Sequence, residues 1–139
     1  MRIAFAALII GALISGCSDS GSSAGGTPAK EQAAPKPVVK VTAKDLFQQY
    51  EENEVATDER IKGAVVEVSG VVQSIDKDFM DAIIIAVKTP NQFMPARLQV
   101  QDADKAKAIA LKKGAKVVAL CQKMSRVVGA PSGRDCTIQ

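Results

Sequence analysis

The 139-residue sequence contains no histidine and no tryptophan, and it has a single tyrosine. Histidine is the side chain that most often acts as a general acid or base near neutral pH, and it is the commonest metal ligand in proteins. Its absence excludes catalytic triads built on histidine and argues against zinc hydrolases. The scarcity of aromatic rings leaves little material on which nucleic-acid bases could stack.

A surplus of positive charge is also missing from the part of the chain expected to fold. Residues 41–139 hold fourteen lysines and arginines against thirteen aspartates and glutamates. A nucleic-acid-binding domain usually carries a surplus that displaces counterions from phosphates, so the composition argues against nucleic acid as a partner. The charges are unevenly placed: residues 45–59 hold six acids and no base, whereas residues 105–134 hold eight bases and no acid. This distribution predicts a dipolar surface.

The first residues have the features of an export signal. Met1 and Arg2 give a positive start, and residues 3–14 form an apolar run of twelve residues that ends in small side chains. A helix that spans the hydrocarbon layer needs about 20 apolar residues, so this run is too short for a membrane span. We therefore predict a signal peptide over residues 1–16.

The residues Ile14-Ser15-Gly16-Cys17 resemble the lipobox of bacterial lipoproteins. The resemblance implies that the thiol of Cys17 receives a diacylglyceryl group and that the chain is cleaved before it, with palmitate or a similar acyl chain on the new amine. Two or three acyl chains hold a protein on a membrane firmly. Ser18 at the next position implies transfer to the outer membrane, with the protein facing the periplasm. The alternative is a chance cysteine after an ordinary cleavage site.

Residues 17–40 contain the candidate lipidated cysteine and a stretch rich in serine, glycine, alanine and proline. Such a composition has almost nothing to bury, so we predict a disordered tether. The remaining residues, 41–139, fit one domain of common size.

Two further cysteines, Cys121 and Cys136, would lie in a compartment where disulfides form and persist. We predict that they are bridged, which stabilises the domain by about 3 kcal/mol in the chain-entropy model. Antiparallel pairing of the two places the hairpin centre between Val128 and Gly129, slightly before the apparent turn at residues 130–133, so a bulge or an offset bridge is expected. A reactive thiol is the alternative, but the sequence offers neither a C-x-x-C spacing nor a histidine partner.

Hydrophobic periodicity and turn residues predict the order of elements in residues 41–139. Thr42 and Asp45 form a capping box for a first helix, and Gly70 lies at a change of apolar phase that suggests a β-bulge. Asp102 is expected to cap a later helix that ends at Gly114. The expected helices cover residues 43–53, 57–62 and 102–114, and the expected strands cover residues 64–75, 82–88, 96–101, 115–122 and 135–138.

Three strands, a helix and two strands follow one another in this reading, after an N-terminal helix. That is the order of the OB-fold, a mainly β architecture in which five strands form a partly open barrel, β-β-β-α-β-β. A two-layer α+β sheet is the alternative architecture.

Several segments resemble a known group, the small bacterial OB-fold lipoproteins of the tRNA-anticodon-binding-like (tRNA_anti-like) family. They are LFQQYEENEVA at residues 46–56, the pair Lys62-Gly63, the strand VSGVV at residues 68–72, LKKG at residues 111–114, and Asp135-Cys136. These motifs are structural, so the resemblance implies the fold and the family but transfers no catalytic or binding residue.

The OB groove lies over the second and third barrel strands, between the loops that join strands one to two and strands four to five. Those loops supply the candidate ligand-binding residues, which are Lys77, Phe79, Met80, Arg126 and Arg134. The simpler interpretation is that these are ordinary exposed loop residues. The second and third strands themselves offer no aromatic side chain.

The first functional hypothesis is a non-enzymatic binding module that holds an envelope protein, a peptide or a glycan near the membrane. The alternative is binding of single-stranded nucleic acid or an oligosaccharide in the groove, which the fold suggests but does not establish. An enzyme is the third hypothesis, since Asp76, Asp78 and Asp81 could serve as acid and base or bind calcium. No glycine or glutamate completes a calcium loop there, so we expect no catalysis, no metal and no cofactor.

Overall fold

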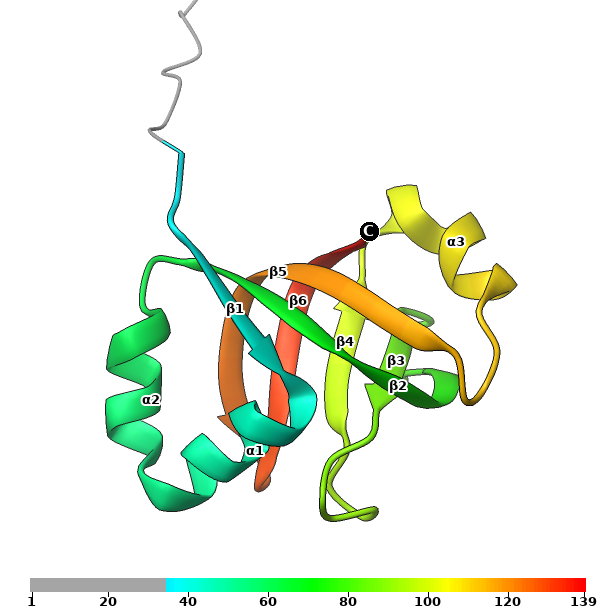
Figure 1. The fold of residues 1–139 in the computed structure, drawn as a ribbon. Helices are drawn as coiled ribbons and strands as arrows, with labels where there is room; N and C mark the ends of the chain where they lie inside the picture. The colour runs from blue at the N-terminus through cyan, green and yellow to red at the C-terminus, as the bar shows by residue number, and fades with distance from the viewer. Residues whose placement is uncertain (1–34) are drawn as a thin grey trace, which may run out of the picture. The chain divides into compact units, whose positions relative to one another are not determined.

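Residues 35–139, which the computed structural model describes, form six strands and three short helices around one core (Figure 1). The predicted signal peptide, Cys17 and most of the predicted tether lie outside these residues. In chain order the elements are β1 Val38–Thr42, α1 Ala43–Glu52, α2 Glu54–Ile61, β2 Val65–Lys77, β3 Ile83–Val87, β4 Ala96–Val100, the 3₁₀ turn η1 Asp102–Asp104, α3 Lys105–Ala110, β5 Lys116–Val127 and β6 Ala130–Ile138. Within this part of the chain no helix has the length and apolar character that crossing a membrane requires.

Strands β2 to β6 close into a five-stranded barrel. The sheet runs in the order β1-β2-β3-β4-β6-β5, and an additional pairing of β2 with β5 closes the barrel and leaves β1 as an extra strand beside β2. The β4–β6 pair is parallel, whereas β2–β3, β3–β4, β5–β6 and β2–β5 are antiparallel. With α3 between the third and fourth barrel strands, this is the OB-fold that the order of elements predicts.

The strand β1 was not predicted. Residues 38–42 pair in parallel with residues 65–69 of β2, and the Val65 amide donates to the Pro37 carbonyl at 2.9 Å. Val39 and Val41 are partly buried against the core, because alternate side chains of a strand point to the same face. Residues 38–40, placed in the tether by the sequence analysis, therefore belong to the folded part.

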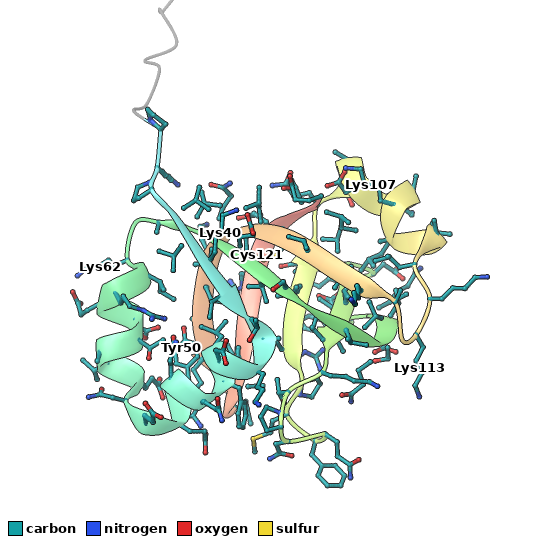
Figure 2. All side chains as sticks on the ribbon, in the orientation of Figure 1. Lys40, Tyr50, Lys62, Lys107, Lys113 and Cys121 are labelled. Atoms are coloured by element: carbon teal, nitrogen blue, oxygen red, sulfur yellow. A yellow bond between two sulfur atoms is a disulfide. The ribbon has the colours of Figure 1, made fainter. Side chains whose placement is uncertain are left out.

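Helix α1 covers the end of the barrel at which the β5–β6 hairpin turns (Figure 1). Thr42 caps it as predicted, since its hydroxyl accepts a hydrogen bond from the Asp45 amide at 3.0 Å. Leu46 and Tyr50 are fully buried in the core, and the Tyr50 hydroxyl donates to Asp58 of α2 at 2.9 Å (Figure 2). Because they recur at helical spacing, these side chains lie on one face of α1, and that face closes one end of the barrel.

The bend in β2 lies further along the chain than predicted. The register against β3 shifts between Val72 and Ser74, not at Gly70. Gly70 has another reason to be glycine: a Cβ there would lie 2.4 Å from a methyl group of Val87. The close approach of β3 to β2 therefore explains the glycine, and the bulge falls at Gln73.

The helix predicted over residues 102–114 is shorter. It begins with the 3₁₀ turn and ends at Ala110, because the chain is extended at Leu111. Asp102 does not cap it. Asp104 instead accepts a hydrogen bond from the Ile138 amide at 2.8 Å and pairs with Lys107 at 3.2 Å. Both contacts lower the pKa of the Asp104 carboxyl, and the bond from the Ile138 amide has the larger effect.

The β5–β6 hairpin contains the predicted disulfide, but its register and its turn differ from the prediction. Cys121 and Cys136 are bonded and lie directly opposite each other, and the register stays constant along the hairpin, so the expected bulge or offset bridge is wrong. The turn is at Val128 and Gly129, which both have positive φ. Gly133, which suggested a later turn, lies within β6.

Steric contact explains that glycine. A Cβ at Gly133 would lie 2.7 Å from the sulfur of Cys121 and 3.1 Å from a methyl carbon of Leu98. Its small size therefore makes room for the disulfide inside the barrel, and the hairpin strands extend well beyond the predicted residues 115–122 and 135–138.

Candidate binding groove

Alternation along β3 and β4 decides which side chains face out of the barrel. Ile85, Val87 and Leu98 are fully buried in the core. Their neighbours Ile84 and Arg97 therefore point to the outer face of the sheet. Ile84 is nonetheless mostly buried, while Arg97 is exposed.

Strand β6 extends the same outer face. Its Ser132 lies opposite Arg97 in the parallel β4–β6 pair, and Gly133 lies opposite the buried Leu98. Arg134, one residue further on, is exposed. The three strands thus present a continuous outer surface of apolar, polar and basic side chains.

An open groove of about 360 Å³ lies over this surface, with the turn between β2 and β3 at one end. Of the five predicted ligand-binding residues, the structure brings three together here: Phe79, Met80 and Arg134. The side chains that give the groove its chemistry are Phe79, Met80, Ile84, Arg97, Gln99 and Arg134. The strand residues among them were not predicted as site residues, although the alternation of ARLQVQ at residues 96–101 already places Arg97 and Gln99 on one face.

The β2–β3 turn exposes two apolar side chains, Phe79 and Met80, to solvent. Asp78 accepts hydrogen bonds from the amides of Met80 at 2.8 Å and Ala82 at 2.9 Å, which fixes the turn. Phe79 lies at the tip of the turn and is 97% exposed. Hydrogen bonds that fix the turn thus present an aromatic ring at a defined place on the surface.

Lys77 serves this turn and does not line the groove. Its amine pairs with Asp81 at 3.0 Å, and both side chains are largely exposed, so the pair contributes little stability. The three aspartates considered as an acid–base or calcium site each have a different partner. Asp76 accepts a hydrogen bond from the Ser74 hydroxyl at 2.6 Å, Asp78 accepts from backbone amides, and Asp81 pairs with Lys77. Within residues 35–139, no cluster of three or more carboxylate, thiol or imidazole groups is arranged to hold a metal ion.

Arg126 lies away from the groove, beneath helix α1. Its guanidinium donates to the Tyr50 carbonyl at 2.8 Å, pairs with Glu51 and lies 3.7 Å from Glu54. The side chain is only 19% exposed. Because the sequence predicts a strand that ends at residue 122, Arg126 was expected in a loop, but it lies in β5 and links the barrel to α1.

The groove has a surplus of positive charge, because two arginines, Arg97 and Arg134, line it together with one carboxylate, that of Asp78. Among the residues that the structure describes, neither Arg97 nor Arg134 takes part in an ion pair. Asp135, next to Arg134, pairs with Lys123 at 3.8 Å, and Asp78 is engaged by backbone amides. Guanidinium groups present several donors in a planar fork, which suits carboxylates and phosphates.

A family model described as tRNA_anti-like matches residues 1–137 of the chain. Among solved structures, the chain is similar to a lipoprotein from Klebsiella pneumoniae subsp. pneumoniae MGH 78578 to which nucleic-acid binding has been ascribed, with a TM-score of 0.53 and 18% sequence identity. The similarity covers 72% of this chain and 92% of the other, and at this identity it shows the fold alone. No curated protein matches the sequence.

Proposed function

Because the chain belongs to the tRNA_anti-like family, we propose that it is a membrane-anchored, non-enzymatic binding protein that holds a partner in the groove over β3, β4 and β6. In this proposal Cys17 is lipidated and the domain faces the periplasm from the outer membrane. The observation that carries the binding role is the groove itself, where two arginines without ion-pair partners among the described residues lie beside an exposed phenylalanine and methionine.

The chemistry of the groove favours an extended acidic segment of an envelope protein. Arg97 and Arg134 can each receive a carboxylate in a two-pronged hydrogen bond, and Gln99 can bond to a peptide group. Phe79 and Met80 supply apolar contact at one end. A run of acidic residues next to an apolar side chain matches this pattern.

Single-stranded nucleic acid is the second candidate, because the similar Klebsiella lipoprotein is described in those terms and guanidinium groups also bind phosphates. The outer faces of β3 and β4 argue against it, since they carry Ile84, Ala86, Arg97 and Gln99 and no aromatic ring. Each base stacked on an aromatic side chain contributes about 1–3 kcal/mol. The strands supply no such contribution, and among the groove residues only Phe79 on the β2–β3 turn could stack with a base.

Site-specific crosslinking in living cells tests the proposal. A photo-reactive residue at Gln99 should capture an envelope protein, and the same group at Lys62, in the turn after α2, should not. Arg97→Ala and Arg134→Ala should each weaken capture. If Gln99 and Lys62 capture the same proteins, the groove is not the binding site.

A binding assay separates the two candidates. We expect residues 35–139 to bind a fluorescent single-stranded 20-mer no more tightly than ~10⁻⁴ M at physiological salt, the weak end of non-specific binding. A micromolar complex in fluorescence anisotropy that Arg97→Ala and Arg134→Ala weaken would establish the nucleic-acid alternative instead.

A further inference from the structure

A second hollow lies beside the bend of β2, and it shares no lining residue with the groove. The register shift between Val72 and Ser74 falls at Gln73. On one side of this bend the Lys88 amide donates to the Val71 carbonyl at 2.8 Å, and on the other the Gly114 amide donates to the Val72 carbonyl at 2.8 Å. The backbone therefore sets Lys88 and Lys113 on the two flanks of Gln73.

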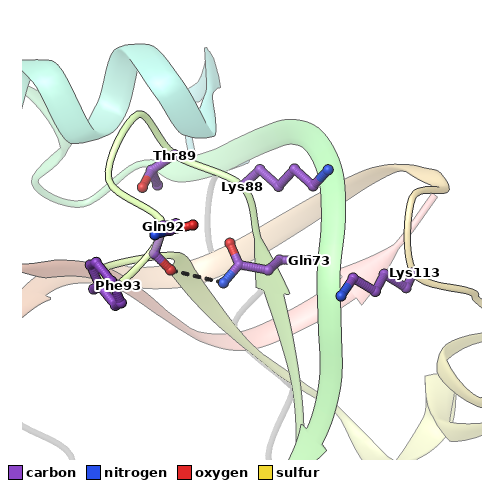
Figure 3. A pocket seen from close by; sticks show the side chains of 6 residues that line it. All are labelled: Gln73, Lys88, Thr89, Gln92, Phe93 and Lys113. Carbon is purple, nitrogen blue, oxygen red and sulfur yellow. Dashed lines mark hydrogen bonds between the residues drawn. The ribbon is translucent and has the colours of Figure 1, made fainter.

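The hollow between these flanks has a volume of about 540 Å³. Figure 3 shows the six side chains that line it, which come from β2, from the β3–β4 loop and from the turn before β5: Gln73, Lys88, Thr89, Gln92, Phe93 and Lys113. Two of them are lysines and none is a carboxylate. This hollow is thus a basic surface within a domain that has nearly equal numbers of acids and bases.

The β3–β4 loop on the wall of the hollow is fixed by hydrogen bonds. The Thr89 hydroxyl lies 2.8 Å from the Asn91 carbonyl and 2.9 Å from the Met94 carbonyl, and the Gln73 side-chain amide donates to the Gln92 carbonyl at 2.9 Å (Figure 3). These bonds hold the loop in place while the Phe93 ring remains 84% exposed.

The two lysine amines have no competing partner. Within residues 35–139, neither Lys88 nor Lys113 forms an ion pair. An ammonium group acts as a compact point charge with three donors, and it binds phosphate without demanding the planar geometry that arginine prefers. Two such groups on the flanks of an amide suit a tetrahedral anion of double charge better than a single carboxylate.

We propose that this hollow is a second binding site, which takes the phosphate group of an organic phosphate between Lys88 and Lys113 and the organic part against Phe93. The site is distinct from the groove, and its existence does not depend on the proposed function. A soluble phosphate monoester and the monoester headgroup of a phosphatidic acid share this chemistry, so the source of the phosphate is decided by experiment.

The experiment is an NMR titration of the mature full-length chain in uncharged detergent, with phenyl phosphate as the soluble probe and short-chain phosphatidic acid as the lipid probe. We expect at least one probe to shift the amide resonances of Gln73, Lys88 and Gly114 with a millimolar dissociation constant. Lys88→Ala and Lys113→Ala should each weaken binding about tenfold, since each removes one charge-assisted hydrogen bond. The stronger probe identifies the source.

Two controls make the result specific. Lys62→Ala removes an exposed lysine in the turn after α2, outside the hollow, and should leave the titration unchanged. Phe93→Ala should weaken binding of phenyl phosphate but leave binding of inorganic phosphate as it was. The proposal is overturned if neither probe shifts these resonances, or if the shifts persist when both lysines are replaced while the rest of the spectrum shows an intact fold.

Discussion

Individual side chains connect the helices to the barrel. Arg126 of β5 binds the carbonyl at the end of α1 and the carboxylate of Glu51, where the helix dipole places partial negative charge. Tyr50 of α1 continues the connection to α2 through Asp58. Burial, followed by the hydrogen bond to Asp58, raises the pKa of the Tyr50 hydroxyl far above its usual value. These contacts join α1 to β5 and to α2, and they lie outside the groove.

Replacing Arg126 should therefore affect folding rather than binding. We expect Arg126→Ala to lower the free energy of unfolding by about 2 kcal/mol, the scale of a hydrogen bond to a charged group. Arg134→Ala is the matched control, which should weaken ligand binding and leave denaturant unfolding nearly unchanged. Lost binding with unchanged stability in Arg126→Ala would restore the sequence-based assignment of this residue to the ligand site.

Tyr50 should make stability depend on alkaline pH. The folded state favours the neutral hydroxyl, so the unfolded state loses its proton first as the pH rises past about 10, and the folded state loses stability above that pH. In Tyr50→Phe this decline should be smaller, and the variant should be about 1 kcal/mol less stable at neutral pH. Unfolding curves between pH 7 and pH 11 measure both effects; parallel pH curves for the two proteins would contradict the assignment.

At the level of elements, the β5–β6 hairpin shows how tightly the barrel is packed around its disulfide. Both sulfurs and Leu98 occupy the space where a side chain at Gly133 would lie. None of these atoms can move away easily, because two are covalently bonded to each other and the third is in the core.

Gly133→Ala should consequently destabilise the domain by about 1–3 kcal/mol, the usual cost of overpacking a core. The cost should shrink when Cys121 and Cys136 are both replaced by alanine, because the two sulfurs nearest to the new methyl group are then gone. Chemical denaturation of the four proteins in this double-mutant cycle gives the coupling energy. Purely additive losses would show that the disulfide and Gly133 do not share this space.

The same hairpin shows what the sequence could and could not predict. Period-two alternation and capping residues predicted the order of the barrel strands and the start of α1. The pairing of the two cysteines placed the hairpin centre correctly between Val128 and Gly129. The apparent turn at residues 130–133 was wrong, because Gly133 is glycine for a packing reason that only the folded contacts reveal. β1 was missed because its few valines follow a stretch typical of a tether. Loop residues of the groove were found, but Arg97 was not among them, since strand residues on an outer face look like ordinary exposed positions.

On the scale of the whole domain, the charge separation that the sequence predicts is found only in part. Lys107 and Lys113 lie at the α3 side of the barrel, away from α1 and α2 (Figure 2). Arg126, which belongs to the same basic stretch of sequence, instead pairs with Glu51 and Glu54 at the acidic side, so the dipole is weaker than the sequence alone suggests. The basic end contains Lys113, which lines the second hollow.

Attachment to the membrane is also a property of the whole molecule. We expect Cys17→Ala to release the protein from the membrane fraction or to leave it as uncleaved precursor, because the lipid is the only anchor that the sequence suggests. Cell fractionation combined with labelling by radioactive palmitate checks both parts. Mature Cys17→Ala protein that still fractionates with the outer membrane would show that the lipobox interpretation is wrong.

The parallel pairing of β1 has a mechanical consequence. β1 is the element through which the folded part joins the chain that precedes it, and it pairs with β2 over five positions from Val38 to Thr42. A partner pulled away from the membrane would transmit tension from the barrel into this strand. Tension along the strand axis loads all the β1–β2 hydrogen bonds at the same time, in shear. β1 would therefore resist such a pull more strongly than a strand whose hydrogen bonds break one after another.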